Sequence, residues 1–176
     1  RSGAEAGDTI WVSGYLGEAA LGLYGVEGRA AASAAQMERY LRPQPRLELG
    51  LMLAPYATAA ADVSDGLLAD VGHIARASGL TACIERGKLP HTPEMAIILT
   101  QNPDYLPLLY SHGDDYEIVF TAKPEHTQAI LALMQTLGLP LSAVGCMKEA
   151  QTSPVILLNE AGQALDVAVS GFMHDI

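Results

Sequence analysis

Residues 62–68 read Asp-Val-Ser-Asp-Gly-Leu-Leu, and this stretch carries the clearest fold signal in the sequence. The apolar run at residues 59–63 predicts a buried strand. The residues after Asp65 predict a helix over 66–77, because their apolar side chains recur at helical spacing and Gly79 suits the left-handed position that ends many helices. A strand that turns directly into a helix is typical of a domain that combines both kinds of element.

Strand-like and helix-like segments alternate along the whole chain. Runs of β-branched and aromatic residues between turns predict strands at residues 9–13, 59–63, 81–85, 118–121, 143–147, 155–158 and 164–167, of which the last two form a hairpin. Small apolar or amphipathic runs predict helices at residues 16–23, 30–41, 47–53, 66–77, 93–99 and 124–137, with an irregular or helical segment at 103–110. We therefore expect one α/β (α+β) domain, residues 1–176, around a mixed sheet.

The composition favours a globular protein and argues against several function classes. Of the 176 residues, 49% are hydrophobic and 17% are charged, so the chain can bury a sizeable core. The formal net charge is −10 and the basic residues are scattered, which argues against nonspecific binding of nucleic acid or of an anionic membrane. No apolar run approaches the roughly 18 to 20 residues of a membrane span.

Cysteine usage and the start of the chain allow two further expectations. Cys83 and Cys146 lack the spacing of a metal site and are too few for a disulfide framework. This usage fits a cytoplasmic protein, and no signal peptide is visible. The chain begins at Arg1 without a methionine, so we expect a fragment or a processed product.

The first acidic segment, residues 62–66, has the residue types of a site for a metal-bound phosphate. The start of a helix offers unpaired N–H groups and a positive dipole end, and carboxylates recruit the Mg²⁺ that neutralises a phosphate. Asp62 and Asp65 can share one metal cluster, while Ser64 can donate to a phosphate oxygen and Gly66 keeps the backbone clear of the ligand. The alternative is that Ser64 or Asp65 only caps the helix.

The second acidic segment, residues 113–117, reads Gly-Asp-Asp-Tyr-Glu and precedes a predicted strand. Its three carboxylates, Asp114, Asp115 and Glu117, repel one another unless a cation or water separates them. A cationic ligand would relieve this repulsion, and a solvated turn is the alternative. With the first acidic segment, it indicates Mg²⁺-dependent phosphoryl chemistry.

Three polar residues near these segments suggest no chemistry of their own. We interpret His112 as a turn residue and His73 as a structural histidine. We expect Asp70, on the helix after the first acidic segment, to be solvated.

The order and separation of the two acidic segments resemble the C-terminal half of the thiamine-monophosphate kinase family, in the aminoimidazole-ribonucleotide-synthetase-like superfamily. The resemblance spans nearly the whole chain, through R-S-G-A at 1–4, L-G-E-A-A-L-G-L at 16–23, D-V-S-D-G-L-L-A-D-V-G-H-I at 62–74, G-D-D-Y-E at 113–117 and G-F at 171–172. Members of that family transfer the γ-phosphoryl group of ATP to thiamine monophosphate and make thiamine diphosphate with Mg²⁺. The resemblance implies the fold of the superfamily's C-terminal domain.

The resemblance also implies roles for individual residues. Asp62 and Asp65 correspond to Mg²⁺ ligands, and Arg1 and Ser64 correspond to residues that contact ATP. In-line phosphoryl transfer needs mainly metal ions, positioning and charge stabilisation, which agrees with the lack of an obvious general base.

The implied contacts to thiamine monophosphate are Asp114 and Phe172. A carboxylate and an aromatic face are both complementary to a positively charged thiazolium ring. The sequence departs from the family at His112, which occupies the position of a usual glycine. The family also has an N-terminal domain with further Mg²⁺ ligands, much of the ATP site and a homodimer interface, and this chain has no counterpart of it.

Two alternative functions stay open at this point. One is another ATP-using enzyme of the same superfamily, such as a purine-pathway synthetase or a selenophosphate synthetase. The other is a non-catalytic acidic module that binds Ca²⁺ or Mg²⁺, which tight metal binding without nucleotide would favour.

Overall fold

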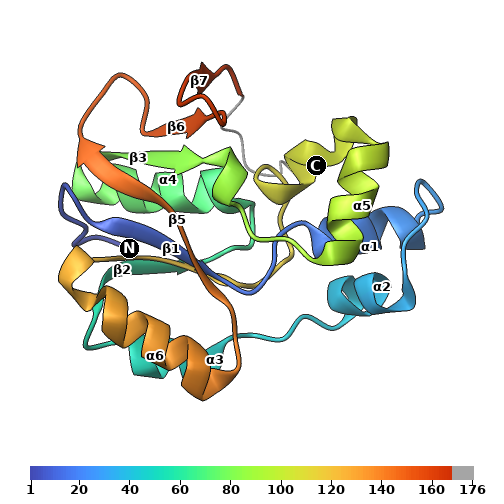
Figure 1. Cartoon of the computed structure of the whole chain (residues 1–176), viewed down its shortest axis with the longest axis horizontal. Coiled ribbons are helices and arrows are strands. Elements are labelled where there is room, and N and C mark those ends of the chain that lie inside the picture. The colour runs from blue at the N-terminus through green and yellow to red at the C-terminus, as the bar shows by residue number, and fades with distance from the viewer. Residues whose placement is uncertain (168–176) are drawn as a thin grey trace.

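In the computed structural model, which describes residues 1–167, a seven-stranded mixed sheet forms the centre of the molecule (Figure 1). Its strands are β1 (Thr9–Ser13), β2 (Ala57–Asp62), β3 (Leu80–Glu85), β4 (Ile118–Ala122), β5 (Leu141–Glu149), β6 (Val155–Leu158) and β7 (Ala164–Leu165). Their spatial order is β2-β4-β1-β5-β3-β6-β7. All neighbours are antiparallel except β3 and β6, which run parallel. The predicted mixed sheet and its terminal hairpin are confirmed.

The helices also follow the predicted order. They are α1 (Glu18–Val26), α2 (Ala34–Leu41), α3 (Leu47–Leu53), α4 (Leu67–Ser78), α5 (Pro93–Gln101) and α6 (Thr127–Leu137), with short 3-10 helices η1 (Arg86–Lys88), η2 (Pro103–Leu109) and η3 (Pro124–His126).

Helices α1 and α2 begin later than predicted, for local reasons. Gly17 takes a left-handed conformation with φ of 79°, so α1 starts only after it. Helix α2 starts after a capping box in which the Ser33 side chain and Gln36 satisfy each other's backbone N–H groups.

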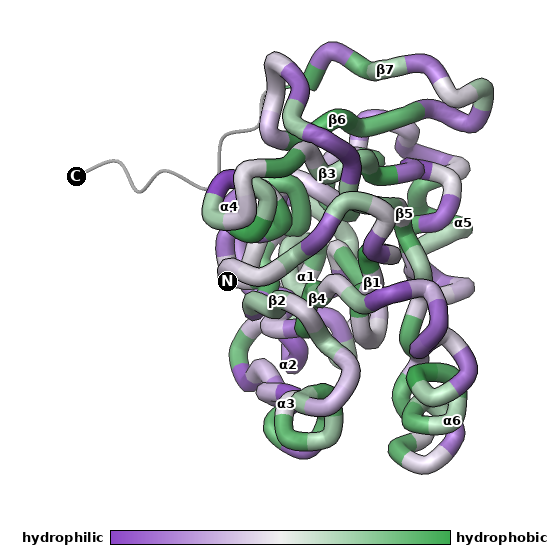
Figure 2. Tube along the Cα trace, turned by 90° about the vertical axis from the view of Figure 1, so that its left-hand side faces the viewer, coloured by the Kyte–Doolittle hydropathy of each residue, from purple (hydrophilic) through white to green (hydrophobic). Residues whose placement is uncertain are grey.

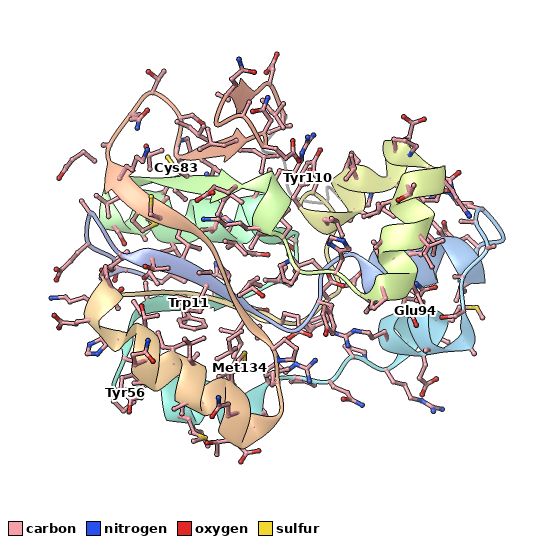
Figure 3. All side chains as sticks on the ribbon, in the orientation of Figure 1. Trp11, Tyr56, Cys83, Glu94, Tyr110 and Met134 are labelled. Atoms are coloured by element: carbon pink, nitrogen blue, oxygen red, sulfur yellow. The ribbon has the colours of Figure 1, made fainter. Side chains whose placement is uncertain are left out.

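Helices cover both faces of the sheet and create two hydrophobic clusters. Successive β1 residues point to opposite faces, so Ile10 and Val12 join the cluster under α1, α4 and α5, while Trp11 joins the one under α3 and α6. Trp11 lies between the sheet and α6 (Figure 3) and stacks on Phe120 of β4, with ring centroids 6.3 Å apart. Hydrophobic stretches of α3 and α6 lie at one end of the molecule (Figure 2).

Strand β2 lies at one edge of the sheet and leads straight into α4. This edge therefore places the first acidic segment at the surface, beside the chain that enters the neighbouring strand β4.

Within residues 1–167, every helix is too short or too polar to cross a bilayer.

Candidate functional site

The two acidic segments, about fifty residues apart in sequence, lie side by side. Beyond the paired strands β2 and β4, the Val63 N–H donates to the carbonyl of Glu117 at 2.8 Å, and the Tyr116 N–H donates back to Val63 at 3.0 Å. The Asp114 N–H donates to the carbonyl of Ser64 at 3.1 Å. The predicted metal segment and the predicted substrate segment thus form one continuous surface.

Two glycines permit this close approach. A Cβ atom on Gly113 would lie 1.9 Å from the carbonyl oxygen of Ser64. Gly66 has φ of +108°, and its Cβ would lie 2.9 Å from the Ser111 carbonyl carbon. Gly66 therefore lets the first acidic segment pack against Ser111 and His112, directly before the second acidic segment.

The start of α4 differs from the sequence prediction. The helix begins without a side-chain cap from Ser64 or Asp65. Instead, the carboxylate Oδ2 of Asp70 reaches back and accepts from the backbone N–H groups of Ser64 and Asp65, each at 3.0 Å. The helix-capping interpretation of Ser64 and Asp65 is therefore wrong, and both side chains are available for a ligand.

Asp70 was expected in solvent, and this expectation is wrong, because its side chain is buried and only 1% exposed. Burial raises its pKa to about 6, and the nearby Asp65 carboxylate adds to the rise, against the two backbone N–H groups that lower it. Asp70, Asp65 and His73 each bring a possible metal-ligand atom into a cluster within 4.8 Å. Asp62 does not belong to this group.

Arg1 and Asp62, a predicted ATP contact and a predicted metal ligand, lie close together. The Arg1 guanidinium is 3.9 Å from Asp62 Oδ1, and both side chains are about half exposed. Asp65 is also exposed, and Ser64 is half-buried between the two carboxylates. The structure thus brings together the four residues predicted for nucleotide and metal.

Two acids of the second acidic segment are buried, which excludes the solvated-turn interpretation for them. Asp115 is 5% exposed and accepts from the backbone N–H groups of Gly17 at 2.7 Å and Ala19 at 3.2 Å, at the start of α1. Burial raises the pKa of Asp115 to about 7, despite these two donors. Glu117 has no exposed surface at all.

The charge of Glu117 is met by two arginines of this chain. Arg46 makes a bidentate ion pair with its carboxylate at 2.7 and 2.8 Å, Arg39 adds a further ion pair, and the Ser13 hydroxyl donates at 2.6 Å. Arg39 and Arg46 of this chain thus supply part of the positive charge that the carboxylates of the second acidic segment need. Neither arginine could be predicted as a partner from the sequence, because Arg46 and Arg39 lie 71 and 78 residues from Glu117.

Alternation in the second acidic segment directs Asp114 and Tyr116 away from the core. Asp115 and Glu117 are buried, whereas Asp114 and Tyr116 are half-buried. Both half-buried residues adopt left-handed backbone conformations, with φ of 67° and 49°. Such conformations are uncommon outside glycine and often occur at binding sites.

A cavity of about 540 Å³ opens beside this surface. Asp62, Tyr116 and Ile118 line one side, and α3 with the proline bend before it lines the other. Leu47 and Leu51 of α3 are 75% and 80% exposed. The sequence held no signal for this wall, because nothing in residues 47–53 distinguishes exposed leucines from the buried Leu49 and Leu53.

The remaining predicted site residues have simpler outcomes. His112 packs edge-on against Tyr24, and its Nε2 lies 3.2 Å from the Tyr24 hydroxyl, as expected for a structural residue. His73 lies in the acidic cluster described above and is paired with Arg76. Phe172, the second predicted substrate contact, lies outside the described residues.

Comparisons with known proteins show which family this chain resembles. Residues 5–157 match the family described as AIR synthase related protein, C-terminal domain. The chain is 39% identical over 155 residues to the thiamine-monophosphate kinase of Caulobacter vibrioides, covering 86% of this chain and 44% of that protein. The chain spans about half the length of the curated relatives it matches.

Two solved structures have the same architecture. Thiamine-monophosphate kinase from Stenotrophomonas maltophilia K279a superposes with a TM-score of 0.80 and 38% identity, covering 93% of this chain and 53% of that one. A structure described as AaThiL complexed with AMPPCP and TMP has a TM-score of 0.77 and 27% identity, covering 94% and 51%. The resemblance drawn from the two acidic segments is confirmed, and the chain belongs to the family of AIR synthase related proteins, C-terminal domain.

Proposed function

We propose that this chain is the C-terminal part of an ATP- and Mg²⁺-dependent kinase that converts thiamine monophosphate into thiamine diphosphate. The observation that carries the proposal is the contact between the two acidic segments beside a cavity. In a chain similar to thiamine-monophosphate kinases, this contact supports a single site for a metal-bound phosphate and a cationic ring.

The first acidic segment supplies the phosphate side of this site. The exposed carboxylates of Asp62 and Asp65 are oxygen donors of the kind that Mg²⁺ prefers, so the donor set fits the ion. Bound Mg²⁺ neutralises charge on the transferring phosphoryl group. Ser64 donates to a phosphate oxygen, and Arg1, beside Asp62, adds positive charge toward the nucleotide phosphates.

The cavity beside Asp62 suits the nucleotide base. Leu47, Leu51 and Tyr116 provide apolar and aromatic surface, and the phosphate-binding residues begin at its rim. The related structure with AMPPCP, an analogue of ATP, supports nucleotide binding by proteins of this fold.

The second acidic segment supplies the substrate side. Asp114 faces outward beside Ser64, where its carboxylate complements a thiazolium cation, and Phe172 provides an aromatic face for the same ring. The related structure with TMP supports thiamine monophosphate as the acceptor.

The proposed enzyme includes a second domain in addition to the part represented by this chain. The relatives are about twice as long as this chain, and the matched family model describes a C-terminal domain. From the resemblance to the thiamine-monophosphate kinase family, we infer that an N-terminal domain supplies further Mg²⁺ ligands and a homodimer interface. Neither nucleic acid nor membrane has a role in this proposal, and the enzyme acts in the cytoplasm.

The test is product formation by a full-length protein, meaning this chain joined to an N-terminal half like that of its relatives. With Mg²⁺, ATP and thiamine monophosphate, we expect thiamine diphosphate and ADP in equal amounts. Phosphoryl transfer to another acceptor, or ATP cleavage without thiamine diphosphate, would instead favour a purine-pathway or selenophosphate type of enzyme.

A further inference from the structure

We propose that Asp65, Asp70 and His73 form a divalent-cation site separate from Asp62, with a preference for ions such as Mn²⁺ over Mg²⁺. The proposal rests on the proposed role of Asp65 as a cation ligand and adds two ligands to it. One possible ligand atom from each residue lies within 4.8 Å of the others. Two atoms that are each about 2.2 Å from a cation are at most about 4.4 Å apart, so side-chain shifts of a few tenths of an ångström suffice.

Asp70 provides the strongest argument for a ligand. Its Oδ2 is used by the backbone N–H groups of Ser64 and Asp65, which fixes the carboxylate at the start of α4. Its Oδ1 is buried and has no hydrogen-bond partner within residues 1–167. A buried carboxylate oxygen without a partner is costly, and a bound cation would satisfy both this oxygen and the charge of Asp65.

His73 lies one turn further along α4, three residues after Asp70, so both side chains share a helix face. Its Nδ1 lies 3.1 Å from the Arg76 guanidinium, which can only donate, so Nδ1 carries a lone pair. Arg76 is exposed. A metal ion bound to the His73 ring therefore competes only with a surface side chain and displaces nothing from the core.

The ligand set determines the preferred ion. Mg²⁺ takes oxygen ligands almost exclusively, whereas an imidazole with two carboxylates suits first-row transition ions. The exposed Asp62, paired with Arg1, offers only oxygen and remains, with Asp65, a ligand for Mg²⁺ near the nucleotide.

The experiment measures Mn²⁺ binding to this chain without nucleotide, by calorimetry and by pulsed electron paramagnetic resonance. We expect a nitrogen coupling from a directly bound imidazole. His73→Gln should abolish that coupling and weaken Mn²⁺ by about tenfold or more, while Mg²⁺ binding changes little. Asp70→Asn should weaken the binding of both ions, because an amide nitrogen replaces one carboxylate oxygen and the negative charge is lost. The fold should persist, because the remaining oxygen can still accept from the N–H groups of Ser64 and Asp65.

The matched controls are His126→Gln, a half-buried histidine at the start of α6, and Asp104→Asn, an exposed acid in η2. Both should bind Mn²⁺ as the parent chain does, and thermal midpoints check that every variant is folded. A nitrogen coupling that survives His73→Gln, or equal losses in the controls, would overturn the site. This experiment measures metal binding and not thiamine diphosphate formation. Failure of the metal site would therefore appear in the Mn²⁺ measurements, and failure of the kinase proposal would appear in the product assay.

Discussion

Glu117 joins four separate parts of the chain through one buried carboxylate. It stands before β4 and binds Ser13 at the end of β1, Arg39 in α2 and Arg46 before α3. These contacts fix the proline bend and hence the start of α3, which forms one wall of the cavity at Asp62. An acid in the second acidic segment thus shapes the site without facing it.

Replacing Glu117 by glutamine should therefore destabilise the fold strongly. The variant leaves two guanidinium groups without their buried carboxylate, and removal of one partner of a buried ion pair costs about 3 kcal/mol or more. Chemical denaturation measures this loss. Glu38→Gln is the control, because the Glu38–Arg42 pair lies on the surface of α2 and should contribute far less. Equal effects of the two variants would contradict this role of Glu117.

The raised pKa of Asp115 predicts a pH-dependent stability. The folded state holds its proton up to about pH 7, whereas an unfolded aspartate releases it near 3.8. The folded state thus binds more protons between these values, so the contribution of Asp115 to stability decreases as pH rises from about 4 to 7. Arg39 lowers and Glu117 raises this pKa, but burial is the largest cause.

Asp115→Asn isolates this effect. The difference in unfolding free energy between variant and parent should shift in favour of the variant as pH rises through this window. A difference that is constant with pH would mean that the N–H groups of Gly17 and Ala19 keep the folded carboxylate ionised.

Asp62→Asn and Asp65→Asn should reduce turnover of the full-length protein far more than its stability. Both acids are exposed, so the fold does not depend on their charge, whereas loss of one charge-stabilising group typically lowers turnover by about a hundredfold or more. Turnover and thermal midpoint are measured together, with Asp104→Asn as the exposed control. Near-normal turnover at saturating Mg²⁺ would remove both residues from the proposed metal site.

The elements themselves were largely predictable, because each is specified locally. Apolar periodicity located α4 and β4, and prolines and glycines marked most ends. The contacts between elements could not be predicted in this way. The burial of Asp70 and the pairing of Glu117 with Arg46 depend on segments that are far apart in the sequence and meet only in the folded chain. The order and spacing of the two acidic segments, together with the family resemblance, predicted Asp62, Ser64 and Asp114 as site residues, whereas no sequence motif placed α3 beside them.

The contact between the two acidic segments can be tested through glycine. Gly113→Ala should destabilise the protein and separate the segments, because its Cβ would overlap the Ser64 carbonyl. Gly50→Ala is the matched control: its Cβ meets only Ile118 at 3.8 Å, and alanine in α3 should stabilise the helix by about 0.5 to 1 kcal/mol. Denaturation curves of both variants measure the difference, and a neutral Gly113→Ala would contradict the tight packing described here.

At the scale of the whole molecule, the site is built at one edge of the sheet. Among the described residues 1–167, strand β2 pairs only with β4. Helix α3 exposes Leu47 and Leu51, and Asp62 and Asp65 are exposed beside it. The interior of the domain is in contrast well packed on both faces of the sheet. Stability is therefore a property of this domain, whereas the proposed chemistry depends on what meets this edge.

This division predicts the behaviour of the 176 residues expressed alone. They should fold, because both clusters are formed within the chain, but they should make no measurable thiamine diphosphate, since Asp62 and Asp65 provide only part of a metal shell. Exposed leucines on α3 should also promote self-association, which Leu51→Lys should reduce.

Light scattering and a thiamine diphosphate assay with Mg²⁺ and ATP measure both outcomes, and the full-length protein is the positive control. Ile97→Lys tests whether any added charge has the same effect, because Ile97 is an exposed apolar residue of α5 that does not line the cavity. Turnover by the short chain at the rate of the full-length protein would show that Asp62 and Asp65 need no further metal ligands. The proposed division between a stable domain and a site completed at its edge would then be wrong.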